Sequence, residues 1–168
     1  MEKFKVKIRT ARESDIDILI KLRAILLDGN SNATYVSKSE KEKIRWKKSY
    51  ENWLTTFFHG KSNITANIFV ADIEGNVVGC ATGIVDSRPP APDCTNGSCG
   101  WVQSVAVIPI WRRKGIAQKM LSNLLCWFTD QNINKVLLEA TPESNSLYKK
   151  IGFKSSTENL FIYRGKTL

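Results

Sequence analysis

The feature that most constrains this chain is a segment in which an apolar strand turns directly into a long helix. The predicted strand covers 101–108 and ends at Pro109, since proline cannot donate a ladder hydrogen bond. A basic turn follows, and the predicted helix covers 115–130. The first N–H groups of a helix have no partner within it, and its dipole is positive at this end. The segment therefore predicts an anion site of the kind that binds phosphate groups.

The residues around the start of this helix suit such a site. Gly115 has no Cβ, so the backbone can approach an anion closely, and Ala117 keeps the first turn clear. The basic residues 112–114 add positive charge, and no Asp or Glu occurs between Cys94 and Thr129. The Walker A pattern and the dinucleotide pattern G-x-G-x-x-G are both absent from the sequence. Those two classes of phosphate loop are therefore excluded.

The rest of the chain alternates between strand and helix patterns, which indicates one α/β (α+β) domain over 1–168. Apolar alternation predicts strands over 5–9, 67–72, 77–85, 101–108, 135–140 and 160–164. Helical spacing predicts helices over 14–27, 39–58, 115–130 and 144–151. Ser14 is the expected N-cap of the first helix. Segment 86–100 has three prolines and two glycines and predicts a long functional loop.

Composition and cysteine spacing narrow the class of protein. No apolar run approaches the roughly 20 residues of a membrane helix, and the first residues lack the apolar core of a signal peptide. We therefore expect a cytoplasmic protein with reduced thiols that does not contact membranes. The four cysteines lack C-x-x-C spacing and the lone His59 is remote from them, so we expect no metal site. A Cys94–Cys99 disulfide is left open.

The net charge of +9 is compatible with a nucleic acid, an acidic protein or a small polyphosphate ligand. A second basic cluster covers 38–48, where the lysines and Arg45 alternate with Glu40 and Glu42. Mixed signs on a helix are typical of a solvated face. The sequence also lacks the interleaved aromatic and basic residues of a base-stacking surface. The pattern therefore favours a small anionic ligand over a nucleic acid.

Two motifs resemble the GNAT superfamily of N-acetyltransferases. Arg112-x-x-Gly115-x-Ala117, after a strand of the form Val-x-Val-x-Pro, is similar to the family's acetyl-CoA motif, Gln/Arg-x-x-Gly-x-Gly/Ala. Downstream, residues 147–153 are similar to the family's Leu-Tyr-x-x-x-Gly-Phe. The opening segment and the hairpin over 71–79 also resemble the family, so the resemblance covers nearly the whole chain. It implies a GNAT-like fold, with a mixed central sheet flanked by helices on both faces.

The resemblance also implies an activity and a role for each matching position. It implies an acetyl-CoA-dependent transferase in which a primary amine attacks the acetyl group directly in a ternary complex. Tyr148 would be the catalytic acid that protonates the departing thiolate. Strand backbone would bind the pantetheine arm and loop N–H groups the pyrophosphate. The residues implied to bind acetyl-CoA are Val105, Ala106, Val107, Arg112, Arg113, Lys114, Gly115, Ile116 and Ala117.

Departures from the family pattern leave the general base and the acceptor open. The position where some members have a Glu base is Gln103, and a frequent Asn is replaced by Thr141. Asp86 and Glu139, near expected strand ends, are carboxylates without an assigned role. The acceptor, a small molecule or a peptide, is expected between the stretch 31–58 and the loop 86–100. A non-catalytic acyl-CoA-binding domain, a basic nucleic-acid-binding domain and a homodimer also remain open.

Overall fold

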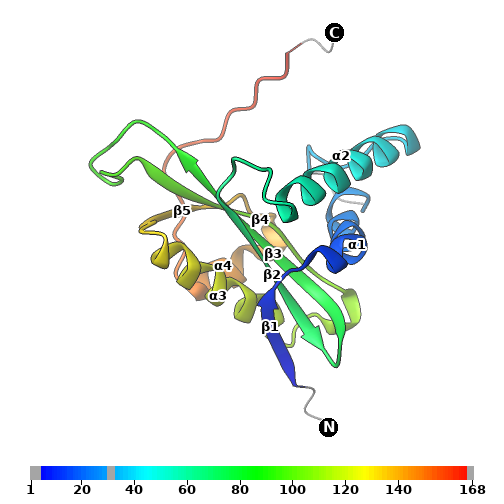
Figure 1. The fold of residues 1–168 in the computed structure, drawn as a ribbon. Coiled ribbons are helices and arrows are strands. Elements are labelled where there is room, and N and C mark those ends of the chain that lie inside the picture. Colours follow the sequence, from blue (N-terminus) through cyan, green and yellow to red (C-terminus); the bar gives the residue numbers. More distant parts are fainter. Residues whose placement is uncertain (1–4, 30–32, 166–168) are drawn as a thin grey trace.

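A five-stranded sheet forms the centre of the protein, in a computed structural model that describes residues 5–29 and 33–165 (Figure 1). The strands are β1 (Val6–Thr10), β2 (Ala66–Ile73), β3 (Asn76–Ser87), β4 (Ser98–Val107) and β5 (Lys135–Leu137). They lie in the order β1-β2-β3-β4-β5. The first four pair antiparallel, whereas β5 runs parallel to β4. The predicted mixed sheet is confirmed.

Helices cover both faces of the sheet, as predicted (Figure 1). The helices are α1 (Ile16–Leu27), α2 (Glu40–Phe58), α3 (Ile116–Asp130) and α4 (Asn145–Ile151). Three single turns of 3₁₀ helix cover Glu13–Asp15, Pro109–Trp111 and Pro142–Ser144. Alternate residues of each strand face opposite layers. Ile68 and Val70 pack with α1 and α2, whereas Phe69 and Ala71 pack with α3.

Two glycines of the sheet allow α3 to lie very close to it. A Cβ on Gly83 would lie 2.7 Å from Leu124 Cδ1, and one on Gly100 would lie 2.7 Å from Phe128 Cε1. Two carbon atoms that are not bonded to each other do not approach this closely, so a larger residue at either position would push α3 away from the sheet. Leu124 and Phe128 are fully buried as a result. This packing fixes the N-terminus of α3 beside the end of β4.

The start of α1 depends on Asp15 rather than on the predicted Ser14. Arg9 on β1 donates two hydrogen bonds to the Asp15 carboxylate, of 2.7 and 3.0 Å, and the Arg12 N–H donates a third of 2.8 Å. Burial alone would raise the pKa of Asp15, but the bonds from Arg9 and Arg12 outweigh it and hold the pKa below its usual value. Ser14 lies exposed within the 3₁₀ turn. The predicted cap at Ser14 was wrong, because the neighbouring Asp15 has a charged partner, Arg9, on β1 and Ser14 has none there.

Replacing Asp15 by Asn is expected to lower the free energy of unfolding at pH 7 by about 2–3 kcal/mol, because Arg9 loses a buried charged partner. The lowered pKa of Asp15 makes this contribution complete above about pH 5 and lost as the pH falls through the folded-state pKa. Urea denaturation of both proteins between pH 3 and pH 8 measures the difference. The exposed Asp17, on the same helix, supplies the control variant Asp17→Asn. A constant difference across this range would contradict the assignment.

The segment predicted as a loop over 86–100 forms a loop over 88–97, between the paired ends of β3 and β4. β3 and β4 stay paired out to Ser87 and Ser98 (Figure 1). The turn is closed by a 2.7 Å hydrogen bond from the Arg88 N–H to the Gly97 carbonyl. Gly97 adopts φ 68°, a left-handed conformation that glycine tolerates. The predicted loop is confirmed over 88–97, where prolines 89, 90 and 92 lie, whereas its two ends belong to β3 and β4.

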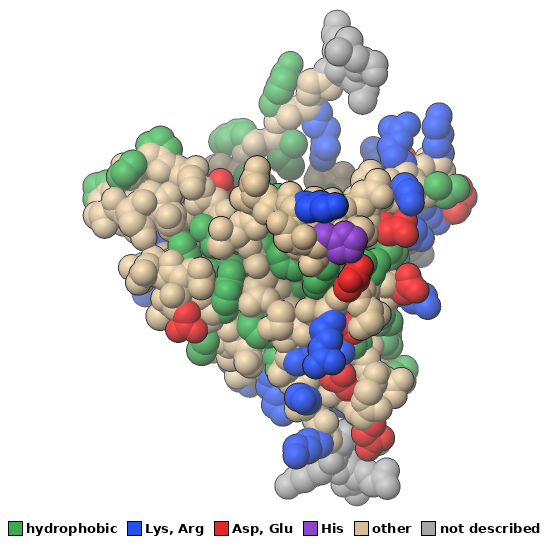
Figure 2. All heavy atoms as spheres, viewed as in Figure 1, with side chains coloured by type: hydrophobic (Ala, Val, Ile, Leu, Met, Phe, Trp, Pro, Cys, Tyr) green, Lys and Arg blue, Asp and Glu red, His purple; other side chains and the backbone are tan. Residues whose placement is uncertain are grey.

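The C-terminal part of the chain departs from the prediction in two places. β5 ends at Leu137 instead of 140, and segment 160–164 forms no strand. Leu160, Phe161, Ile162 and Tyr163 are 54–93% exposed. Figure 2 shows hydrophobic side chains along this segment at the top of the molecule. Apolar residues predict a strand only where a neighbouring strand is available, and none pairs with this segment in the part of the chain that is described.

The cysteines and the helices bear on two further points raised by the sequence. All four cysteines are free thiols, so the Cys94–Cys99 bridge is not formed. Within residues 5–29 and 33–165, no helix has both the length and the apolar character needed to cross a bilayer.

Candidate functional site

The sheet opens between β4 and β5. The two strands pair only where Cys99–Trp101 meets Lys135–Leu137, and β4 continues to Val107 without β5 beside it. A pocket of about 320 Å³ occupies this opening. Its walls come from α1, β4, α4 and the segment after β5. The residues that line it are Arg23, Leu26, Leu27, Tyr35, Trp101, Val102, Gln103, Ser104, Val105, Glu139, Thr141, Ser144 and Tyr148.

A β-bulge in β4 shapes one wall of this pocket. Gln103 is opposite Thr82 and Ala106 is opposite Cys80, so Ser104 and Val105 together face a single residue of β3. Ser104 adopts φ 52°, the left-handed conformation that redirects the strand. Its carbonyl accepts a hydrogen bond of 3.4 Å from Cys80 Sγ, and its hydroxyl accepts one from Arg23. The bulge therefore turns β4 backbone groups toward the pocket and holds them there.

The turn between β4 and α3 presents a row of free backbone donors. The first hydrogen bond of α3 runs from the Lys119 N–H to the Gly115 carbonyl, at 3.1 Å. Among the described residues, the N–H groups of 113–118 donate to no backbone carbonyl. Gly115 adopts φ 76°, and a Cβ there would meet no protein atom within 4 Å. These donors and the positive end of the α3 dipole can hold an anion outside the protein surface.

Arg112 has a structural part in this turn. Its N–H donates to the Pro109 carbonyl at 3.1 Å, and its Nε donates to the Val107 carbonyl at 3.0 Å. Arg112 therefore ties the turn to the end of β4, and its N–H is not among the free donors. The Lys114 ammonium lies over the Trp111 ring, 5.1 Å from its centroid. Of the predicted loop residues, 113–117 keep N–H groups available for an anion.

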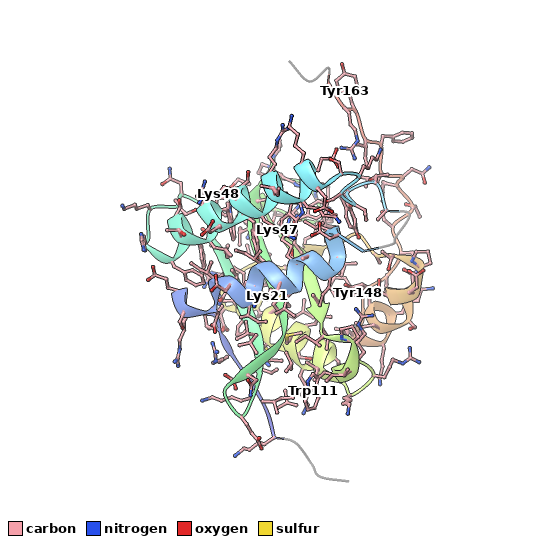
Figure 3. The ribbon with its side chains drawn as sticks, turned by 90° about the vertical axis from the view of Figure 1, so that its right-hand side faces the viewer. Lys21, Lys47, Lys48, Trp111, Tyr148 and Tyr163 are labelled. Carbon is pink, nitrogen blue, oxygen red and sulfur yellow. The ribbon has the colours of Figure 1, made fainter. Side chains whose placement is uncertain are left out.

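Tyr148 lies on α4 at the far wall of the pocket from the bulge. Its ring is half-buried and packs edge-on against Phe153, with the centroids 5.9 Å apart. In Figure 3 it lies next to the C-terminal end of α1, whose Leu26 and Leu27 line the same pocket. Burial raises the pKa of Tyr148, and Tyr35 adds to this shift. The hydroxyl is therefore protonated at neutral pH and can donate a proton into the pocket.

Glu139 is the carboxylate of this pocket. No other acidic side chain lines it among the residues described. Asp86 lies outside the pocket and forms a 3.0 Å ion pair with Arg88. Gln103 and Thr141, the two departures from the family pattern, both line the pocket. Asp86 and Glu139 share a neighbouring pocket of about 520 Å³, and of these two carboxylates only Glu139 also lines the pocket between β4 and β5.

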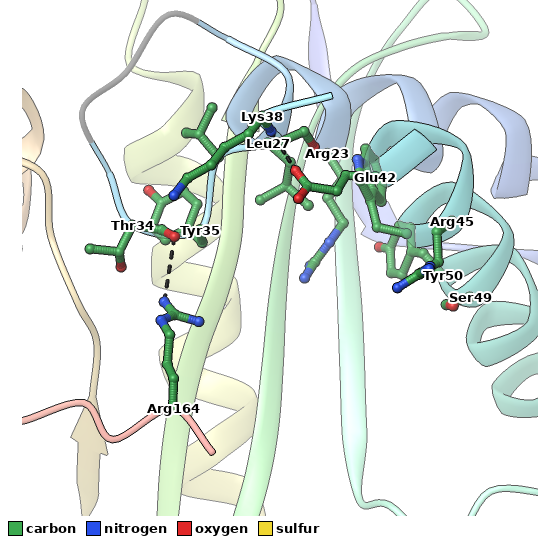
Figure 4. Close-up of a pocket in the computed structure, with 13 residues that line it drawn as sticks. Arg23, Leu27, Thr34, Tyr35, Lys38, Glu42, Arg45, Ser49, Tyr50 and Arg164 are labelled. Atoms are coloured by element: carbon green, nitrogen blue, oxygen red, sulfur yellow. Dashed lines mark hydrogen bonds between the residues drawn. The ribbon is translucent and has the colours of Figure 1, made fainter. Parts of the chain in front are cut away.

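A second pocket of about 700 Å³ adjoins the first and shares Arg23, Leu27 and Tyr35 with it (Figure 4). Residues 34–38 and α2 form much of its wall, as the predicted boundary 31–58 requires. The predicted loop 86–100 contributes no residue to either of these pockets, and its Asp86 and Ser87 line a neighbouring pocket of about 520 Å³ together with Gln103 and Glu139. The other predicted boundary of the acceptor therefore stays a prediction. Sequence reasoning did not identify Arg23 as a site residue. The available signal was a charged side chain on the same helical face as the buried Leu19.

The buried thiols are unsuited to nucleophilic chemistry. Burial raises the pKa of Cys80 to about 12, and burial also raises the pKa of Cys99, which is 1% exposed. A thiol in this state is a poor nucleophile, because the thiolate is the reactive form. In the part of the chain covered by the structure, no three His, Cys, Asp or Glu side chains group as metal ligands would.

Comparison with known proteins identifies the family. Residues 31–153 match the model of the acetyltransferase (GNAT) family. An aminoglycoside N(6')-acetyltransferase type 1 of Salmonella typhimurium is 22% identical over 99 residues. That alignment covers 57% of this chain and 67% of the relative.

Solved structures share the fold at low identity. A predicted acetyltransferase from Clostridium acetobutylicum, solved with acetyl-CoA, has a TM-score of 0.75 at 22% identity, covering 95% of this chain and 96% of that one. Aminoglycoside N-acetyltransferase AAC(6')-Iy, solved with CoA, has a TM-score of 0.73 at 16% identity, covering 99% and 98%. The family match spans most of the chain and includes both sequence motifs. The chain therefore belongs to the GNAT family of acetyltransferases, and the predicted acyltransferase class is confirmed.

Proposed function

We propose that this protein transfers the acetyl group of acetyl-CoA to a primary amine, by direct attack of the amine in a ternary complex. The observation that carries the proposal is the opening between β4 and β5. It brings Tyr148 and Glu139 into one pocket with the bulge at Ser104. The free N–H groups at the start of α3 lie at the end of the same strand. Relatives solved with acetyl-CoA or CoA support this choice of donor.

The chain offers two surfaces that fit acetyl-CoA. The N–H groups of 113–118 suit a pyrophosphate, because they are unpaired and lie at the positive end of α3. The edge of β4 beyond Trp101 is not paired with β5, so Val105 and Val107 can bind the pantetheine amides as a neighbouring strand would. The thioester would then lie in the pocket between the bulge and Tyr148.

The reaction needs one proton removed and one proton supplied. An amine with a pKa near 10 is protonated at neutral pH and must lose a proton before it can attack. Glu139 is the carboxylate placed to accept it, directly or through water. The nitrogen–carbon bond then forms, and the carbon–sulfur bond breaks. Tyr148 donates its proton to the departing thiolate, and a backbone N–H of the bulge stabilises the oxyanion in between.

Replacing Glu139 by Gln is expected to lower kcat by a factor of about 10 to 100, because water can still accept the amine proton. Acetyl-CoA affinity should not change, since Glu139 lies away from the α3 donors. Steady-state kinetics on an accepted amine measures both quantities. Glu143→Gln is the matched control, because Glu143 is exposed and lines neither pocket. Equal kcat values for Glu139→Gln and wild type would remove Glu139 as the base.

Half of the six basic residues in the cluster over 38–48 are ion-paired, which weakens the case for nucleic-acid binding. Lys43 is ion-paired with Glu40, Lys47 with Asp28 and Lys48 with Glu51, at 2.6–3.0 Å. Charges neutralised in this way contribute little attraction for a phosphate backbone.

An amine screen with thiol detection tests the proposed activity. It should yield CoA thiol in proportion to the added amine and enzyme. Calorimetric titration with acetyl-CoA in parallel separates the two remaining classes. Tight acetyl-CoA binding with no amine-dependent thiol release across primary amines would instead identify a binding domain without turnover.

A further inference from the structure

The pocket beside the reacting centre is strongly basic. Four cationic side chains line it together with one carboxylate, Glu42. The cations come from separate segments: Arg23 from α1, Lys38 from the turn before α2, Arg45 from α2 and Arg164 from the C-terminal segment (Figure 4). A volume of about 700 Å³ suits a small molecule.

The single carboxylate of this pocket is occupied by a structural task. Glu42 accepts a 2.5 Å hydrogen bond from the Lys38 N–H, and the Glu42 N–H donates to Ser39 Oγ at 3.2 Å. Ser39 is thus the N-cap of α2, and the Glu42 carboxylate ties the residue before this cap to the first turn of the helix. The charge of Glu42 is therefore directed at the helix terminus, and it is not paired with a cation of the pocket.

The four pocket cations hold no carboxylate among the residues that the structure describes. Within residues 5–29 and 33–165, every ion pair is formed by other side chains. Within α2, Lys43, Lys47 and Lys48 each hold a carboxylate, whereas Arg45, at the pocket, and Lys41, outside it, hold none among the described residues. The pocket thus gathers four cations from separate segments, and none of them is paired with a carboxylate of the described residues.

Arg23 is a pocket cation whose orientation is fixed by its contacts. Its guanidinium lies over the Tyr50 ring, 4.7 Å from the centroid, and donates a hydrogen bond to Ser104 Oγ. These contacts fix the plane of a half-buried cation and leave other N–H groups of its fork available. A guanidinium held in this way binds a carboxylate or phosphate in bidentate fashion. An anionic ligand would also offset the cost of partly desolvating the charge.

We propose that the amine acceptor carries an anionic group, a carboxylate or a phosphate, which binds this basic pocket. The proposal rests on the proposed function, because it names the acceptor class of the same enzyme. The two pockets share Arg23, Leu27 and Tyr35, so one ligand can occupy both. Its amine then lies toward Glu139 and its anion toward Arg45.

The same charges act against a polycationic acceptor. Aminoglycosides carry several amino groups, which are largely protonated at neutral pH. Like charges placed together in a pocket are mutually unfavourable, and the effect is largest where water is excluded. This chain is therefore expected to differ in acceptor from the aminoglycoside acetyltransferases that it resembles at 16–22% identity.

Matched acceptor pairs test the proposal. Lysine is compared with lysinamide for the carboxylate, and phosphoethanolamine with ethanolamine for the phosphate, with spermidine and kanamycin as polycations. For each, we measure kcat/KM by thiol release and binding to the CoA complex by calorimetry. The variants are Arg45→Gln and, as control, Lys41→Gln, which removes a charge from the same helix outside both pockets.

The wild type is expected to favour the anionic member of at least one pair by about tenfold or more. Arg45→Gln should reduce that preference about tenfold and leave acetyl-CoA affinity unchanged, whereas Lys41→Gln should match the wild type. The pair that shows the preference distinguishes carboxylate from phosphate. Anion-dependent binding to the CoA complex without turnover would uphold the pocket and remove the proposed activity. Equal or better use of neutral or polycationic amines, or no binding of either anionic amine, would overturn the proposal.

Discussion

Replacing Tyr148 by Phe is expected to lower kcat by about a hundredfold or more. The phenol is protonated at neutral pH, because burial raises its pKa, and it faces the pocket that contains the bulge of β4. A thiolate with a pKa near that of cysteine, about 8.5, gains from a positioned proton donor. Phe keeps the edge-on packing against Phe153, so the fold and the acetyl-CoA affinity should be preserved. Steady-state kinetics and calorimetry on the same variant measure both quantities.

The control for this variant is Tyr163→Phe, since Tyr163 is 93% exposed and lines neither pocket. It should behave as the wild type does. A loss of only a few-fold in Tyr148→Phe would mean that water protonates the thiolate and that Tyr148 positions the substrate. The family membership of the chain would stand in either case, because it does not depend on this hydroxyl.

Replacing Gly115 by Asp is expected to reduce acetyl-CoA affinity by about a hundredfold or more. The new carboxylate would stand among the free N–H groups at the start of α3, where the pyrophosphate is proposed to bind. The Asp carboxylate and the bound pyrophosphate would both be negative. Their repulsion is expected to exceed roughly 2.7 kcal/mol, which is the free energy that corresponds to a hundredfold loss of affinity. Calorimetric titration with acetyl-CoA measures the change, and circular dichroism verifies the fold.

Gly115→Asn separates charge from backbone effects. Gly115 adopts φ 76°, and Asn and Asp are the residues that tolerate this region best after Gly. A side chain there meets no protein atom within 4 Å of the Cβ, so both variants should fold. We expect Asn to lose less than about tenfold in affinity, because it is neutral. Equal affinities for Asp, Asn and Gly would place the pyrophosphate elsewhere.

The parts of the site that could be predicted from the sequence are those set by local structure. Pro109 ends β4, and Gly115 adopts the left-handed conformation that begins α3. Both are properties of single residues, so the strand–turn–helix segment and its free donors follow from the sequence alone. Tyr148 lies within a short motif whose helix, predicted over 144–151, forms over Asn145–Ile151.

The parts that could not be predicted depend on contacts between distant residues. Asp15, and not Ser14, stands at the start of α1, where its carboxylate is held by Arg9 from across the turn. Glu139 and Arg23 reach the pocket only because β4 and β5 diverge and α1 packs over the opening. Pairing decides whether an apolar segment becomes a strand, which is why 160–164 stays exposed. No spacing in the sequence specifies these tertiary contacts.

The most direct test of direct transfer from acetyl-CoA to an amine is the initial rate as a function of both substrates. The buried thiols are poor nucleophiles, because burial raises their pKa, and the two pockets adjoin, so both substrates can bind at once. We therefore predict a ternary complex. Double-reciprocal plots at several amine concentrations should then give lines that intersect. Parallel lines, the pattern of an acetyl-enzyme intermediate, or a rate independent of the amine would contradict the account.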